Sequence, residues 1–64
     1  MKYEIFKSDE KQYGIRAKES KKVLAEIKNI TVSKEKAQEM TELFNKHSLS
    51  IIHFKEAVED FLVK

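Results

Sequence analysis

The spacing of hydrophobic residues changes near residue 31, and this change constrains the fold more than any other feature of the sequence. Up to Ile30, apolar and polar residues alternate with a period close to two, which is typical of β-strands with one buried face. From Val32 onward the period is near 3.6 residues, which is typical of amphipathic α-helices. The sequence therefore predicts a β-sheet followed by helices.

Three strands are expected, at about 2–7, 12–18 and 22–30. The polar segments between them are short, and parallel strands would need a crossover of a dozen residues or more. We therefore expect an antiparallel meander with one apolar face. A sheet of this kind needs a cover on one side only.

Two helices, at about 34–46 and 51–63, are expected to supply that cover. Ser33 is suited to cap the first helix because its hydroxyl can accept a backbone N–H of the first turn, and Ser50 is expected to cap the second. In the first helix Ala37, Met40, Leu43, Phe44 and His47 fall at helical spacing. The predicted fold is α+β, in the order β-β-β-α-α, with a helical hairpin packed on one face of the sheet and residues 1–64 forming a single small domain.

The expected core combines the apolar face of the sheet with the apolar stripes of both helices. Its members are Tyr3, Ile5, Tyr13, Ile15, Val23, Ala25, Ile27, Ile30, Val32, Ala37, Met40, Phe44, Leu49, Ile51, Phe54, Val58, Phe61 and Leu62.

The composition limits how such a chain can be stabilised. A chain of 64 residues lies near the lower end of the sizes that fold without disulfides or metals, and this one contains no cysteine. Disulfides and cysteine zinc sites are thereby excluded, so any additional stability is expected from packing or self-association.

Several short motifs resemble a known family. They are Tyr13-Gly14-Ile15, Glu26-Ile27 with Ile30-Thr31, Glu42-Leu43-Phe44-Asn45, Leu49-Ser50, His53 and Val58-Glu59-Asp60-Phe61-Leu62. The chain is similar in these segments to a family of short uncharacterised proteins of anaerobic Gram-positive bacteria, a domain of unknown function. The resemblance covers most of the chain and implies no activity.

No residue pattern indicates an enzyme, and we expect no catalytic, metal or cofactor site. His47 and His53 are six residues apart, whereas a helical metal pair is usually four apart. Glu56, Glu59 and Asp60 cluster on the last predicted helix, but a solvated acidic face explains them, because charged residues are rarely buried unpaired. With one glycine the chain also lacks a phosphate-binding loop.

The basic residues of the second predicted hairpin leave nucleic-acid binding open. Residues 1–32 carry eight basic and five acidic side chains, a net charge of +3, and Arg16, Lys18, Lys21 and Lys22 concentrate the positive charge. A basic β-ribbon can contact a phosphate backbone. Lysines at sheet edges and turns also prevent aggregation, so the same residues have a purely structural explanation.

Protein interaction is the favoured function. Phe6 and Leu24 are expected on the sheet face that the helices leave uncovered, and this face is the predicted interface for a homodimer or a cytoplasmic protein partner. Single exposed apolar residues are common in monomers, which is the alternative explanation. No apolar stretch is long enough for a signal-peptide core or a membrane span, so we expect a cytoplasmic protein without membrane contact.

Overall fold

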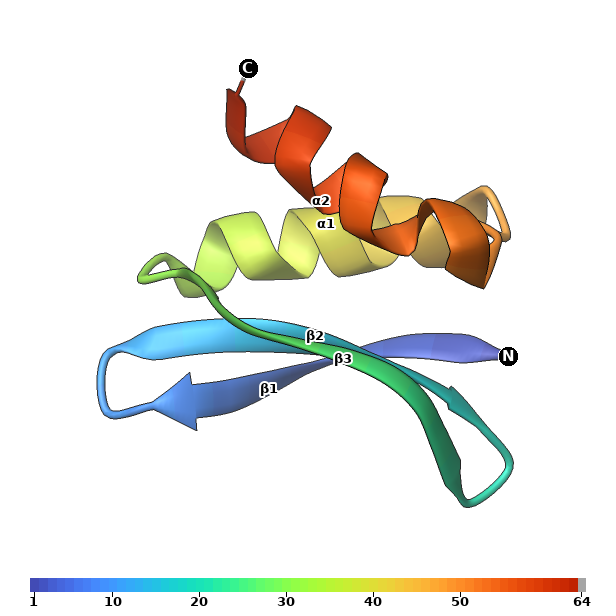
Figure 1. Cartoon of the computed structure of the whole chain (residues 1–64). Helices are drawn as coiled ribbons and strands as arrows, with labels where there is room; N and C mark the ends of the chain where they lie inside the picture. The colour runs from blue at the N-terminus through green and yellow to red at the C-terminus, as the bar shows by residue number, and fades with distance from the viewer. Residues whose placement is uncertain (64) are drawn as a thin grey trace.

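A computed structural model, which describes residues 1–63, shows a sheet on one side of the molecule and two helices on the other (Figure 1). The elements are β1 (Lys2–Asp9), β2 (Gln12–Glu19), β3 (Lys22–Thr31), α1 (Lys34–Lys46), the 3₁₀ turn η1 (Ile51–His53) and α2 (Phe54–Val63). The strands are antiparallel and lie in the order β1-β2-β3. This arrangement confirms the predicted α+β fold and its order of elements.

The strand register brings the apolar residues of neighbouring strands together beneath the helices. Ile15 of β2 lies opposite Ile5 of β1 and Ile27 of β3. Ala17 likewise lies between Tyr3 and Ala25. Because side chains alternate between the faces of a strand, these residues form one apolar layer.

A register shift between Ala17 and Lys18 ends this alternation on β3. Val23, expected in the core, lies opposite Lys18 and is 44% exposed. A bulge inserts an extra residue into one strand, so positions beyond it no longer follow the face predicted by alternation. The expectation for Val23 was therefore wrong.

Two other expected core residues are also exposed. Val32 is 69% exposed, because it lies in the connection between β3 and α1 and belongs to neither element. Leu62 is 46% exposed. On α2 the buried residues are Phe54 and Val58, and Leu62 lies about 100° around the helix from the partly buried Phe61.

Three aromatic rings join the sheet to both helices. The centroid of the Tyr3 ring on β1 lies 5.5 Å from that of Phe44 on α1 and 5.0 Å from that of Phe54 on α2. The rings of Phe44 and Phe54 are 6.1 Å apart and nearly perpendicular. Edge-to-face contacts of this kind add to the free energy of burial. This cluster holds α2 to the rest of the domain.

Tyr3 and Asn45 also connect β1 to the helical layer by hydrogen bonds. The Tyr3 hydroxyl donates to the carbonyl oxygen of Leu49 at 2.8 Å. The Asn45 side chain accepts the Tyr3 backbone N–H at 2.8 Å and donates to the Tyr3 carbonyl oxygen at 3.0 Å. Both backbone groups of Tyr3 are therefore satisfied at the open edge of the sheet.

We expect Tyr3 to make the domain less stable in alkali. Burial raises the pKa of the Tyr3 phenol above its ordinary value of 10.0, because the phenolate is poorly solvated in the core. Above pH 10 the unfolded chain releases this proton more readily than the folded chain, so the free energy of unfolding falls as the pH rises further. Below pH 10 this contribution is fully present.

Urea unfolding at neutral pH and at steps above pH 10 checks this expectation. Tyr3→Phe should lower stability at neutral pH by about 1 kcal/mol, because the hydrogen bond to Leu49 is lost, and should flatten the alkaline decline. An equally steep decline in Tyr3→Phe would assign the alkaline effect to other groups.

Helix α1 begins and ends with well-formed caps. The Ser33 hydroxyl accepts the Lys36 backbone N–H at 3.2 Å, which confirms Ser33 as the N-cap. At the other end Ser48 adopts φ 49°, and Leu49 N–H donates to the Phe44 carbonyl oxygen at 2.9 Å. This is a Schellman motif in which Ser48 occupies the left-handed position usually taken by glycine.

The second helix starts later than expected. Ile51–His53 form a 3₁₀ turn, and the α-helix begins at Phe54 where 51 was expected. The Ser50 side chain makes no capping hydrogen bond, although its carbonyl oxygen accepts His53 N–H at 3.0 Å. The prediction of a Ser50 side-chain cap was wrong, because the tighter turn satisfies this end through the backbone.

Candidate interaction surfaces

Phe6 lies within a stack formed by the sheet itself. It is paired with Gly14 on β2, and the Arg16 guanidinium carbon lies 4.2 Å from the centroid of its ring. A Cβ atom at Gly14 would come within 2.9 Å of the ring, so only glycine leaves room for it. Phe6 is consequently half-buried between a glycine and an arginine. Much of the apolar surface of the Phe6 ring is therefore in contact with other residues of the domain.

The basic side chains of β2 lie beside carboxylates. Arg16 Nε is 3.6 Å from Glu26 Oε2, and Lys18 Nζ is 3.7 Å from Glu4 Oε1. Lys21 and Lys22 are exposed where β2 turns into β3. Two of the four residues predicted to contact nucleic acid, Arg16 and Lys18, therefore have a carboxylate partner within the sheet. Nucleic-acid binding stays a prediction, and the two ion pairs do not strengthen it.

Leu24, the second predicted interface residue, is 40% exposed on β3. Leu24 lies next to the register shift of β3, close to Lys18 of β2. Phe6 of β1 pairs instead with Gly14, near the start of β2. Phe6 and Leu24 belong to the two outer strands. In the register, Arg16 and Lys18 of the central strand come between Gly14, which pairs with Phe6, and the position of Leu24.

One edge strand of the sheet contacts the helical layer, and the other has an irregular backbone. On β1, Asn45 occupies the outward backbone groups of Tyr3. On β3, Asn29 adopts φ 54°, its backbone N–H donates to Ser8 Oγ at 2.9 Å, and Ser8 donates to Asn29 Oδ1 at 2.9 Å. Asparagine tolerates this left-handed conformation better than most residues. The contacts of Asn45 hinder the addition of a further strand at the β1 edge. The bonds between Asn29 and Ser8 join the two outer strands to each other.

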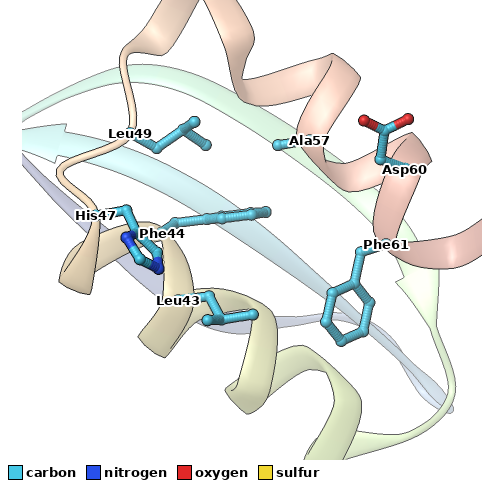
Figure 2. Close-up of a pocket in the computed structure, with 7 residues that line it drawn as sticks. All are labelled: Leu43, Phe44, His47, Leu49, Ala57, Asp60 and Phe61. Carbon is cyan, nitrogen blue, oxygen red and sulfur yellow. The ribbon is translucent and has the colours of Figure 1, made fainter. Parts of the chain in front are cut away.

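An open apolar groove lies between α1 and α2 (Figure 2). Its volume is about 330 Å³. Leu43 and Phe61 point toward one another from opposite helices, and the Phe44 ring lies between the helices (Figure 2). The lining residues are Leu43, Phe44, His47, Leu49, Ala57, Asp60 and Phe61. Most of this lining is apolar, and Leu43 is 42% exposed.

Two further hollows adjoin the groove on the helical face. One shares Leu43 with it and the other shares Phe61. Charged residues of both signs surround the three hollows, and these residues are Lys36, Glu39, Glu42, Lys46 and Asp60. The combined surface, which we call the helical groove, has an apolar centre and a mixed-charge rim. This is the usual anatomy of a protein interface.

Sequence reasoning missed this groove, although it recognised most of its residues. Phe61 was assigned to the core, and Leu43 was noted at helical spacing without being assigned to a surface. The helical period shows which side of each helix is apolar, but the groove depends on how the two helices diverge. The one available signal was the width of the apolar stripe on α1. Leu43 and Phe44 are both apolar and lie about 100° apart around the helix.

The histidines lie in two different places. His47 lines the helical groove together with Asp60, and His53 lies 3.9 Å from Glu56, with both of these side chains exposed. Within residues 1–63, no three histidine, aspartate or glutamate side chains are grouped so that they could hold a metal ion. None of the helices in that range combines the length and the apolar character needed to cross a membrane.

The architecture is that of a small α+β domain with two helices on one side of a meander and an open groove between them. The chain belongs to a family of unknown function (DUF6514), whose model matches residues 1–64. No curated protein and no solved structure matches it. The membership agrees with the resemblance of the sequence to a domain of unknown function.

Proposed function

We propose that this protein is a small, non-enzymatic interaction module of the cytoplasm that self-associates. The observation that carries the proposal is the distribution of apolar side chains. In residues 1–63, eight hydrophobic residues are buried and eight large hydrophobic residues are exposed. The exposed set is Met1, Val23, Leu24, Val32, Leu43, Ile52, Leu62 and Val63.

The size of the domain supports self-association. A chain this short buries a smaller fraction of its surface than a larger domain does, so its core contributes little stability. Association with a second copy would bury further apolar area and stabilise the folded state by mass action. A protein partner other than itself would have the same effect, but a second copy is always present at the same concentration.

The chemistry of the groove supports a binding role over catalysis. The pocket between α1 and α2 has two titratable lining residues, His47 and Asp60, which lie among apolar side chains on an open surface. A general acid or base needs a concave site that shields it from water and holds a partner within hydrogen-bond reach. We therefore assign the groove to contacts between proteins.

Analytical ultracentrifugation of the wild-type chain over a wide concentration range tests the proposal. The chain mass is 7.5 kDa, and we expect a reversible equilibrium between this mass and twice its value. A strictly monomeric protein at the highest concentrations would contradict self-association. Retention of duplex or single-stranded DNA that falls steeply with salt would instead favour the basic hairpin as the functional surface.

A further inference from the structure

We infer that the chain self-associates through the open edge of β3, which pairs antiparallel with β3 of a second copy across a two-fold axis at Leu24. The inference rests on the proposed function and deepens it, because it names the surface and the arrangement. Such pairing joins the two three-stranded sheets into one continuous sheet.

The backbone of β3 faces the open edge at Glu26. β3 is an edge strand, because the strand order is β1-β2-β3. The Ile27 carbonyl oxygen lies against Gly14 of β2, where it is the nearest atom that an added Cβ would meet. Backbone groups of successive residues in a strand point in opposite directions within the sheet, so the N–H and C=O of Glu26 point away from β2.

The hydrogen bonds of Tyr3 lead to the same orientation. Both backbone groups of Tyr3 bind Asn45, so Tyr3 faces away from β2. Its partner Ala17 therefore faces β3, where it is paired with Ala25, the neighbour of Glu26. Glu26 is an exposed residue, although only 30% of its side chain is exposed, so its backbone contributes to that exposure.

Leu24 lies outside the pairing of β3 with β2. Its neighbours Val23 and Ala25 are paired with residues of β2, whereas Leu24 falls in the register shift and has no partner in the described register. The extra residue of a bulge is left outside the ladder in this way. Val23 is 44% exposed and Leu24 is 40% exposed. This part of the edge therefore combines an unpaired residue with two exposed apolar side chains.

The charges along β3 fit a second copy when the axis lies at Leu24. Leu24 then meets its equivalent, and Lys22 lies opposite Glu26 of the second copy, an arrangement that occurs twice in each dimer. Opposite charges directly across a strand pair are stabilising. Glu26 Oε2 already lies 3.6 Å from Arg16 Nε, but a carboxylate can accept from more than one donor, so both contacts can coexist.

Other positions of the axis lack these ion pairs. An axis at Ala25 places Lys22 opposite Lys28, and an axis at Glu26 places two glutamates opposite each other. Like charges directly opposite are destabilising. An axis at Val23 places Glu26 opposite the turn that follows β2. The sequence of β3 is therefore complementary to itself in the register centred on Leu24.

A strand of another protein fits this edge less well. A bulge on an edge strand discourages pairing with a regular strand. In a two-fold dimer both strands carry the bulge at the axis, so the irregular parts meet. The β1 edge is a poorer site because Asn45 fills the outward backbone groups of Tyr3. Pairing through β3 does not use the helical groove, which is left for contacts with other proteins.

Two substitutions of equal charge at nearly equal exposure separate the β3 edge from the groove. Leu24→Glu places two carboxylates against each other at the axis, and Leu43→Glu places one in the helical groove, where the leucine is 42% exposed. Each variant is first checked for native circular dichroism, and its dimer dissociation constant is then measured by ultracentrifugation. We expect Leu24→Glu to raise that constant about tenfold or more. Leu43→Glu should leave it within about threefold of wild type.

A second pair of variants tests the register. Lys22→Glu turns both ion pairs of the dimer into repulsive pairs and should raise the dissociation constant about tenfold. Lys11→Glu makes the same change of net charge at an exposed residue of the turn between β1 and β2. It should leave the constant within about threefold of wild type, because no β3 residue lies opposite it.

Hydrogen exchange of the wild-type chain tests the backbone pairing directly. The Glu26 N–H points to the open edge, so its exchange should slow about tenfold or more when the protein concentration is raised from monomer to dimer. The amide of Ile52, which is 78% exposed, is the control and should exchange at the same rate at both concentrations.

The outcomes distinguish this inference from the proposed function. If the wild type dimerises while Leu24→Glu and Lys22→Glu dimerise normally, or if the Glu26 amide stays unprotected in the dimer, β3 is not the interface and the proposed self-association stands without it. A dimer broken by Leu43→Glu alone would assign the interface to the helical groove. A wild type that remains monomeric would contradict both the inference and the proposed self-association.

Discussion

Phe54→Ala is expected to destabilise the domain by about 3–5 kcal/mol, which is the usual range for removal of a buried aromatic ring. Phe54 is 2% exposed, and its ring contacts both Tyr3 and Phe44. Alanine would leave a cavity at the only point where three aromatic rings join the sheet and both helices in residues 1–63. A loss of this size matters because 64 residues correspond to a total stability of about 3–10 kcal/mol.

The loss should be read from urea unfolding followed by circular dichroism at a fixed protein concentration, because association contributes to apparent stability. Ile52→Ala is the matched control. Ile52 lies two residues earlier and is 78% exposed, so its replacement should change the free energy of unfolding by at most about 0.5 kcal/mol. A loss below about 1 kcal/mol for Phe54→Ala would place this ring outside the core, in conflict with the structure.

Gly14→Ala is expected to destabilise the domain by about 2–3 kcal/mol through overpacking. The added Cβ would press against the carbonyl oxygen of Ile27 on β3 and lie 2.9 Å from two carbons of the Phe6 ring. The Phe6 ring can move, but the Ile27 carbonyl belongs to the sheet backbone and cannot move without disturbing the strand pairing. The single glycine of the chain is therefore required by its neighbours on both adjacent strands.

The sign of this effect is informative. Gly14 has no positive φ, so an alanine with enough room would stabilise the protein by about 0.4–1 kcal/mol by restricting the unfolded chain. A stabilising Gly14→Ala would thus refute the close packing. A double-mutant cycle with Phe6→Leu separates the two contacts. The smaller side chain should recover only part of the loss, because the contact with Ile27 remains.

Much of the fold could be predicted because it follows from local patterns. The alternation up to Ile30 and the helical spacing after Val32 identified the strands and helices, since each period belongs to one type of backbone. The Ser33 cap was predictable for the same reason, because its hydrogen bond to Lys36 spans three residues. Tyr3, Phe44 and Phe54 could be placed in the core because each lies on the apolar side of its own element.

The errors occurred where one segment depends on another. Val23 was misplaced because the register shift on β3 depends on pairing with β2. Phe6 could not be recognised as the centre of a stack, because its contacts with Gly14 and Arg16 form only when β1 and β2 align. The start of α2 shifted from 51 to 54 for a related reason: the connection is shaped by the Schellman turn and by packing of the buried Phe54.

The sequence by itself determined the types and order of the elements and the apolar side of each, because these properties depend on residues a few positions apart. Only the tertiary structure decided which apolar residues remain exposed. The helical groove lies between Phe44 of α1 and Phe61 of α2, and the positions of the two helices depend on how Phe44 and Phe54 pack on Tyr3 of the sheet. Periodicity shows that a side of a helix is apolar, but the shape of the assembled domain determines whether that side is buried.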